Sequence, residues 1–204
     1  MADFKLCVLV SGTGTNLQAI IDQLHASDGI EVAGVASDKA DAMALQRARE
    51  ARIETAVFPR DGYGDREIRD TAMADWVEGR GADLVVLAGY MQLLSASFVT
   101  RFRNRIINVH PALLPAFPGL DAVGQALEHG VKITGVTVHF VDEGVDSGPI
   151  IVQRPIPVPP DRDAAALEEA IHATEHALYP EAIKLIAQGR VRIDPSNPRL
   201  VLIE

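Results

Sequence analysis

Apolar runs and stretches of helical periodicity alternate through the first half of the chain. Lys5–Val10 and Asp83–Ala88 are almost continuously apolar, which predicts strands of the kind buried on both faces of a parallel sheet. Glu31–Ser37 predicts another strand. Leu17, Ile20, Ile21 and Leu24 recur at helical spacing directly after the first strand. The other elements expected here are a helix from Asp38 to about Arg52, a short strand Thr55–Phe58 and a helix from about Arg66 to Glu78.

The second half has the patterns of a more antiparallel structure. Ile133–Val141 alternates strictly, and a strand from Ile150 to about Val158 carries Pro155 and Pro157, which favour an edge position. The other elements expected are a strand Ile106–His110, a helix Asp121–His129, a long helix from Asp161 or Asp163 that Pro180 kinks or restarts, and a small strand at Arg190–Ile193. We therefore expect one α/β domain over residues 1–204 with a mostly parallel sheet and antiparallel strands in the C-terminal half. Its two halves would cover about 1–105 and 106–204.

Composition narrows the classes of protein to consider. The chain has 204 residues, 48% hydrophobic and 23% charged, which suits a globular protein. Its formal net charge of −9 argues against a dedicated nucleic-acid or membrane-surface binder. Cys7 is the only cysteine, so no internal disulfide can form. Without a recognisable membrane span or signal peptide, we expect a cytoplasmic protein.

A glycine-rich turn, SGTGTN at Ser11–Asn16, joins the first strand to the first helix. Small residues let the backbone approach a ligand, and a helix N-terminus offers N–H groups and a positive dipole end. Thr15 or Asn16 could cap the helix or bind a phosphate. No Gly-Lys-Ser/Thr follows, as a P-loop requires, and Leu17 replaces the third glycine of a dinucleotide fingerprint. A plain tight turn remains an alternative, as does a dinucleotide site in which Asp38 binds ribose rather than capping the next helix.

The segment Arg105–Leu120, RIINVHPALLPAFPGL, is the second candidate for chemistry. Asn108 and His110 are two residues apart in a predicted strand, so their side chains share one face. Pro111 disfavours helix at His110 and places it at the extended end of the strand, and the next two prolines keep the following loop irregular. An amide and an imidazole side by side at a strand end indicate a catalytic site, and a plain exposed histidine is the alternative.

Three separated motifs resemble the phosphoribosylglycinamide formyltransferases. They are SGTGTNLQAII (Ser11–Ile21), INVHPALLPAFPGL (Ile107–Leu120) and HFVDEGVDSGPI (His139–Ile150). LAGYMQLLS (Leu87–Ser95) and TEHALYPEAI (Thr174–Ile183) extend the resemblance to nearly the whole chain. It implies a three-layer, Rossmann-like fold. It also implies transfer of the formyl group of 10-formyltetrahydrofolate to the amine of glycinamide ribonucleotide (GAR) in de novo purine synthesis.

The resemblance also implies roles for individual residues. The catalytic residues would be Asn108, His110 and Asp146; GAR would be bound by Gly14, Thr15, Asn16 and Glu175; and the folate by Arg66, Met91, Gln92, Leu93, Leu94, Asn108 and Val141. No metal, nucleic acid or membrane is implied, and the protein would be a monomer or a homodimer. Departures from the family pattern at Ala116, Asp121, Ala122–Gly124 and His172 bear on substrate contacts rather than on the reaction.

Each member of the catalytic set has an expected role. Charge develops on the formyl oxygen during transfer, and the Asn108 amide can donate a hydrogen bond to it. A protonated His110 would do the same and could act as a general acid. Because an unperturbed imidazole has a pKa near ~6.5, we expect the Asp146 carboxylate to raise the pKa of His110.

Other functions remain open at this point. A metal-dependent hydrolase could use His110, His139 and either Asp146 or Glu143 as ligands, although no recognised metal-ligand spacing supports it. A 10-formyltetrahydrofolate hydrolase would share the folate site. A formyltransferase acting on transfer RNA would need an additional basic domain. A non-catalytic nucleotide-binding module would explain SGTGTN but leave the catalytic set without a role.

Overall fold

The computed structural model describes residues 4–204. These residues form two compact units, an N-terminal and a C-terminal one, which divide between Ile107 and Asn108. The division falls inside strand β5 (Ile106–His110), so this strand contributes to both units.

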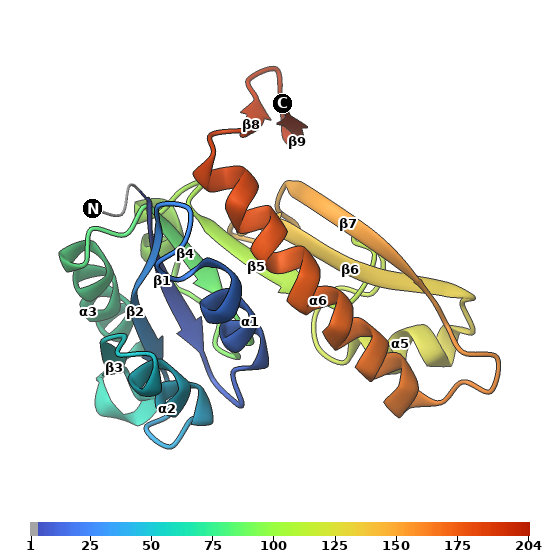
Figure 1. Cartoon of the computed structure of the whole chain (residues 1–204), viewed down its shortest axis with the longest axis horizontal. Helices are drawn as coiled ribbons and strands as arrows, with labels where there is room; N and C mark the ends of the chain where they lie inside the picture. The colour runs from blue at the N-terminus through green and yellow to red at the C-terminus, as the bar shows by residue number, and fades with distance from the viewer. Residues whose placement is uncertain (1–3) are drawn as a thin grey trace. The chain divides into compact units, whose positions relative to one another are not determined.

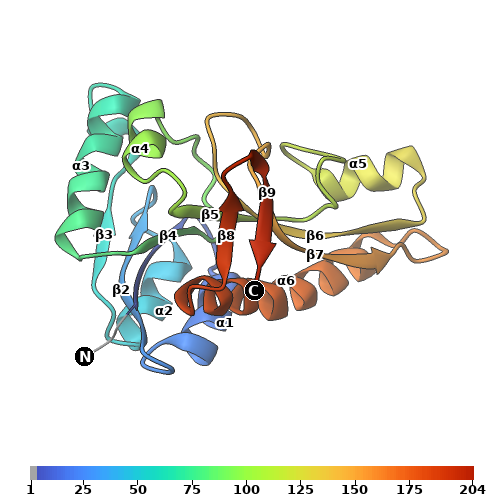
Figure 2. The ribbon, with the colours of Figure 1, turned by 90° about the horizontal axis from the view of Figure 1, so that it is seen from above.

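The N-terminal unit is a parallel sheet covered by helices on both faces. Its strands lie in the order β3-β2-β1-β4-β5, and β1 pairs in parallel with both β2 and β4. Helices α1 and α2 lie on one face, and α3 and α4 on the other (Figure 2). The elements are β1 (Phe4–Val10), α1 (Thr15–Leu24), β2 (Ile30–Ser37), α2 (Met43–Glu50), β3 (Thr55–Val57), the 3₁₀ turn η1 (Arg60–Gly62), α3 (Arg66–Gly79), β4 (Leu84–Leu87) and α4 (Ala96–Arg101).

The apolar runs explain why β1 and β4 are central. All side chains of Leu6–Val10 are fully buried, as the sequence predicts for a strand covered on both faces. The chain moves outward from β1 to β3 and then returns to the other side of β1 as β4. The loops that follow β1 and β4 are therefore neighbours, at the kind of switch point where open α/β sheets bind ligands.

The C-terminal unit contains the antiparallel strands. The strand order is β5-β6-β7, with β6 and β7 antiparallel and β7 at the edge, as its prolines predict. The long helix α6 packs along β6 and β7 (Figure 1), and β9 of the C-terminal hairpin contacts β7. The elements are β5, α5 (Ala122–His129), β6 (Ile133–Phe140), β7 (Ile150–Pro157), α6 (Ala164–Ala187), β8 (Val191–Asp194) and β9 (Asn197–Ile203).

Several local predictions are wrong. The second helix begins at Met43 rather than Asp38, because the Asp38 side chain is buried and accepts a hydrogen bond from Gln92 at 3.0 Å. Helix α6 continues through Pro180, which contradicts one of the two alternatives expected there, the start of a new helix. The N-cap of α1 is Gly14, so neither Thr15 nor Asn16 occupies the cap position. The short α4 and the strand β9 were not predicted.

Candidate active site

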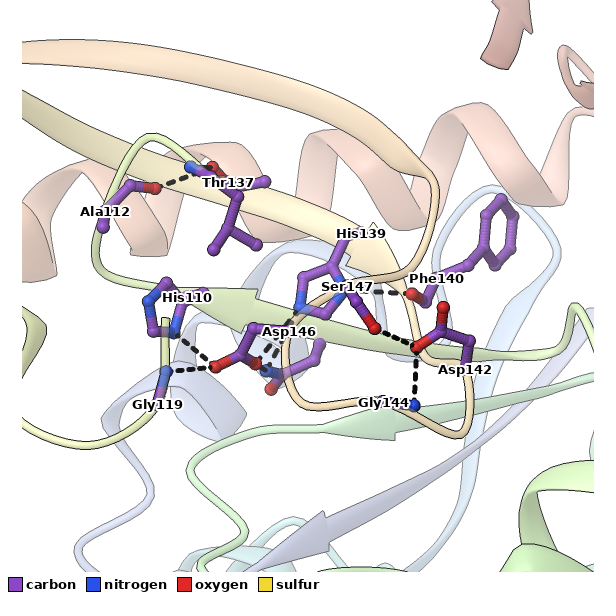
Figure 3. A network of polar contacts seen from close by, with 12 residues as sticks. His110, Ala112, Gly119, Thr137, His139, Phe140, Asp142, Gly144, Asp146 and Ser147 are labelled. Atoms are coloured by element: carbon purple, nitrogen blue, oxygen red, sulfur yellow. Dashed lines mark hydrogen bonds and ion pairs between the residues drawn. The ribbon is translucent and has the colours of Figure 1, made fainter. Parts of the chain in front are cut away.

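The carboxylate of Asp146 is the centre of a polar cluster in the C-terminal unit (Figure 3). Asn108 and His110 reach it from β5, and Asp146 comes from the loop between β6 and β7. His110 Nδ1 lies 3.4 Å from Asp146 Oδ2, and Asn108 Nδ2 lies 3.5 Å from Oδ1. The three residues predicted to be catalytic therefore meet in space, although 36 residues or more separate Asp146 from the other two along the chain.

The hydrogen bonds of His110 define its orientation. Its Nε2 lies 2.8 Å from the backbone carbonyl of Phe117, and a carbonyl oxygen can only accept, so Nε2 carries a proton. The other ring nitrogen, Nδ1, faces Asp146. The imidazole is only 4% exposed, so the alternative of a plain exposed histidine at a strand end is wrong. The ring is instead fixed between a carbonyl and a carboxylate.

A second histidine, His139 on β6, completes the cluster. Its Nδ1 donates to the Phe140 carbonyl at 2.9 Å, and its Nε2 lies 3.7 Å from Asp146 Oδ1 and 3.4 Å from Asn108 Nδ2. The 3.7 Å distance between His139 Nε2 and Asp146 Oδ1 is longer than a normal hydrogen bond. The sequence suggests His139 only as a candidate metal ligand. Its place in the HFVDEGVD motif was the one available signal.

Asp146 itself is held in an unusual conformation. Its φ is 50°, in the left-handed region that non-glycine residues rarely adopt. Its Oδ2 accepts a hydrogen bond of 2.8 Å from the Gly119 N–H. Burial raises the pKa of the Asp146 carboxyl, but His139, the Gly119 N–H and His110 together outweigh burial and hold the pKa below its usual value. Asp146 is therefore an ionised carboxylate at neutral pH.

The loop that carries Asp146 is organised by Asp142. Asp142 Oδ1 accepts hydrogen bonds from the Gly144 N–H at 3.0 Å and from the Ser147 hydroxyl at 2.7 Å (Figure 3). The loop is closed by the Phe140 N–H, which donates to the Pro149 carbonyl at 2.9 Å. These bonds fix the turn on both sides of Asp146.

The loop after β5 is tied to β6 by a buried hydroxyl. Thr137 Oγ1 donates to the Ala112 carbonyl at 2.6 Å and accepts from the Leu114 N–H at 3.1 Å. The Gln153 amide on β7 donates to both Thr137 Oγ1 and the Leu114 carbonyl, at 2.9 Å and 2.8 Å. These hydrogen bonds hold the chain that leaves His110.

The predicted phosphate loop lies in the N-terminal unit and is supported by α2. Gly14 has a φ of 75°, and a Cβ at this position would lie 2.6 Å from the Ala44 Cβ. The Ala44 N–H donates to the Gly12 carbonyl at 3.1 Å, and Arg47 Nε donates to the Thr13 carbonyl at 2.8 Å. Only glycine suits this left-handed, crowded position, and the turn leads directly into the N-terminus of α1.

The predicted folate segment adjoins the start of this loop. The Ser11 N–H donates to the Gly89 carbonyl at 3.1 Å, and the Met91 N–H donates to Ser11 Oγ at 2.9 Å. Met91 and Leu93 expose 62% and 64% of their surface, so they lie outside the core. Exposed apolar side chains beyond the end of a parallel strand suit a flat organic ligand.

Three further residues predicted to bind substrates lie on or next to α3, β6 and α6. Arg66 is exposed at the first residue of α3, Val141 is half-buried just after β6, and Glu175 is buried on α6. Their assigned ligands stay predictions.

The cluster does not have the arrangement of a metal site. Within residues 4–204, no three His, Cys, Asp or Glu side chains are placed to hold a metal ion. His110 and His139 face opposite oxygens of Asp146, and the second nitrogen of each ring donates to a carbonyl. The same range contains no helix long and apolar enough to cross a membrane.

Comparison with known proteins agrees with these motifs. The formyl transferase family model matches residues 4–183. The phosphoribosylglycinamide formyltransferase of Haemophilus influenzae is 43% identical over 190 residues, which cover 93% of this chain and 90% of that protein. The trifunctional purine biosynthetic protein adenosine-3 of Drosophila melanogaster is 45% identical over 94% of this chain, but the match spans only 14% of its own length.

A solved structure gives the same result for the fold. The glycinamide ribonucleotide transformylase 1 of Symbiobacterium toebii superposes with a TM-score of 0.92 at 49% identity, over 98% of this chain and 93% of that one. Family match, sequence identity and fold therefore agree over almost the whole chain. The chain belongs to the formyl transferase family and, within it, to the phosphoribosylglycinamide formyltransferases.

Proposed function

We propose that this protein transfers the formyl group of 10-formyltetrahydrofolate to the amine of GAR, giving formyl-GAR and tetrahydrofolate. One observation supports this proposal most strongly. In a chain of the formyl transferase family, the side chains of Asn108 and His110 lie beside the ionised carboxylate of Asp146. The amine nitrogen attacks the formyl carbon, and the bond from that carbon to folate N10 then breaks. The amine loses one proton and N10 gains one, so the reaction is balanced without a metal or a redox cofactor.

The three residues have distinct tasks in this reaction. Asn108 donates an amide N–H to the oxygen that becomes negative, and His110 stabilises the same charge in its protonated form. Asp146 favours the protonated imidazole through its negative charge, 3.4 Å away. In the resting geometry, Asn108 Nδ2 has only long contacts, of 3.4 Å and 3.5 Å, which leave it available for a stronger acceptor.

The substrates are assigned to the segments that suit their chemistry. Gly14, Thr15 and Asn16, at the start of α1, bind the phosphate of GAR, and Glu175 binds its ribose hydroxyls. The folate contacts are assigned to Arg66, Met91–Leu94, Asn108 and Val141. Both units therefore contribute residues assigned to GAR and to the folate, and the three residues assigned to the reaction belong to the C-terminal unit.

A formyl-transfer assay tests this proposal directly. Release of tetrahydrofolate from 10-formyltetrahydrofolate is followed by absorbance, with and without GAR. We expect release that depends on GAR and yields formyl-GAR. GAR-independent release with formate as the product would instead identify a 10-formyltetrahydrofolate hydrolase, and no release by the folded protein would contradict both.

Two broader features belong to the same proposal. We expect the protein to work in the cytoplasm, because purine synthesis is carried out there and the one cysteine, Cys7, is buried and unpaired. We expect a monomer or a homodimer, which sedimentation at micromolar concentration would distinguish.

A further inference from the structure

One peptide group connects helix α5 to the carboxylate of Asp146. The Gly119 N–H donates to Asp146 Oδ2 at 2.8 Å, and the carbonyl of the same peptide, that of Pro118, accepts from Gln125 Nε2 at 3.3 Å. A trans peptide points its C=O and N–H in opposite directions, so Gln125 and Asp146 hold it from its two sides. Hydrogen bonds in such a chain polarise and strengthen one another.

Gln125 is well placed to hold this peptide. Its second amide proton goes to the Leu120 carbonyl at 2.9 Å, and since both neighbours are acceptors, the side-chain nitrogen must face them. The helix that carries it is capped by Asp121, whose carboxylate accepts from the Gly124 N–H at 3.1 Å. A Cβ at Gly124 would collide with the Asp121 carboxylate, so this cap requires glycine at position 124. Asp121 and Gly124 are both departures from the family pattern, and the second makes room for the first.

The peptide needs such a restraint. Pro118 and Gly119 resemble the two central residues of a type II turn. Proline is common at the first of these positions, and the second needs a positive φ, which Gly119 has at 82°. Nothing lies within 4 Å of the place where a Gly119 Cβ would be, and glycine also accepts the alternative backbone conformation. Rotation of the Pro118–Gly119 peptide would turn its N–H away from Asp146 and remove one of the contacts that keep this carboxylate ionised.

The same loop also holds His110. The Phe117 carbonyl accepts from His110 Nε2, and Phe117 has a φ of 54°, unusual for an aromatic residue. The Phe117 ring packs against His129 of α5, with ring centroids 5.3 Å apart. Backbone groups of residues 117–119 thus contact both members of the His110–Asp146 pair, while the side chains of α5 fix those groups.

We propose that Gln125 is a positioning residue for formyl transfer, because it locks the Pro118–Gly119 peptide in the orientation that holds Asp146 against His110. The inference rests on the catalytic roles proposed for Asp146 and His110. Gln125 acts on the reaction through the Pro118–Gly119 peptide and Asp146, and no contact with either substrate is assigned to it.

The test compares three substitutions at this position. Gln125→Leu removes both donated hydrogen bonds at similar volume, Gln125→Lys retains donors, and Gln125→Glu presents a carboxylate to two carbonyls. We expect kcat to fall about 10-fold in Gln125→Leu with little change in either KM, a loss typical of one hydrogen bond in the transition state. Gln125→Lys should recover most of this loss, whereas Gln125→Glu should not.

A spectroscopic readout separates positioning from general destabilisation. In ¹H–¹⁵N spectra, the Gly119 amide proton should move upfield in Gln125→Leu relative to the wild type, and the carboxyl carbon of Asp146 should titrate at a higher pH than in the wild type. Glu128→Gln is the matched control, because Glu128 is exposed on the same helix. It should keep the wild-type kcat, Gly119 shift and Tm.

Two results would overturn the inference. The first is a wild-type kcat in folded Gln125→Leu, whether or not the Gly119 signal moves. The second is an equal loss of kcat in Gln125→Lys and Gln125→Glu. This second comparison also tests the inference if Gln125→Leu does not fold. His110→Ala separates this inference from the proposed function. Wild-type activity in His110→Ala would remove the catalytic assignment itself, whereas inactive His110→Ala beside fully active Gln125→Leu would remove only the role of Gln125.

Discussion

His110 Nδ1 lies 3.4 Å from Oδ2 of Asp146, and the opposite ring nitrogen donates to the Phe117 carbonyl at 2.8 Å. A protonated imidazole satisfies both neighbours, since it can donate from both nitrogens. A neutral ring with its proton on Nε2 would turn a lone pair toward the carboxylate. The protonated ring is also the form that best stabilises a developing oxyanion.

Removing either member of this pair should abolish most of the activity. We expect His110→Ala and Asp146→Asn each to lower kcat by about 10²- to 10⁴-fold, the range for loss of a positioned acid–base group. Circular dichroism should show an unchanged fold, and steady-state kinetics with both substrates measures the loss. A rate close to that of the wild type in either variant would refute the catalytic assignment.

The low pKa of Asp146 also has a consequence for stability. Its pKa in the folded protein lies below its ordinary value, whereas in the unfolded chain it should be near ~3.9. Ionised Asp146 therefore stabilises the fold above pH ~3.9, and this contribution is lost as pH falls through the folded pKa. Asp146→Asn should lower the free energy of unfolding at pH 7, and its difference from the wild type should shrink as the pH falls below ~3.9. Urea denaturation at several pH values measures both proteins, and a pH-independent difference would contradict the assignment.

The buried hydroxyl of Thr137 should contribute to stability. Thr137→Val keeps the shape but leaves the buried Leu114 N–H and Ala112 carbonyl without this partner. We expect a loss of about 1–3 kcal/mol in the free energy of unfolding, the usual cost of unsatisfied buried polar groups. Thr137→Ser, which retains the hydroxyl, is the control and should lose less. A loss in Thr137→Val no larger than the loss in Thr137→Ser would contradict the expectation that the hydrogen bonds outweigh the methyl group.

Two glycines in the predicted phosphate loop should respond differently to alanine. Gly14 has a left-handed backbone and its Cβ would meet Ala44, whereas nothing lies within 4 Å of a Cβ at Gly12. Gly14→Ala should therefore lose about 1–2 kcal/mol of stability from backbone strain alone and raise the KM for GAR. Gly12→Ala should stay within about 0.5 kcal/mol of the wild type. Urea denaturation of the pair is the measurement, and equal losses would refute the steric argument.

The Asp142 side chain should influence catalysis from outside the catalytic set. Asp142→Ala removes the acceptor that orders Gly144 and Ser147 around Asp146, so we expect kcat to fall about 3- to 10-fold, as for the loss of one or two exposed hydrogen bonds. Asp142→Asn retains an acceptor oxygen and should keep most of the activity. Kinetics of the two variants under identical conditions checks this, and an unaffected Asp142→Ala would show that the loop needs no such support.

Much of the architecture follows from local patterns of residues. The apolar run at Lys5–Val10 predicted a strand buried on both faces, and the helix predicted over Asp121–His129 is α5, with Asp121 as its N-cap. The two-residue spacing of Asn108 and His110 put both side chains on one face of β5, and both reach Asp146. These features depend on backbone geometry and on neighbours within a few residues, which is why the sequence could predict them.

Contacts between distant segments depended on the packing of the folded chain. Asp38 has the local pattern of a helix cap, yet its carboxylate is buried and accepts from Gln92, 54 residues away. No local rule places His139 beside Asp146, or the Gly119 N–H on its carboxylate. Such contacts form only when strands and loops separated in sequence are brought together, because hydrogen bonds between them depend on three-dimensional distance and not on chain spacing. The sequence therefore indicated which residues could carry the chemistry, and the fold determined how their charges and protons are arranged.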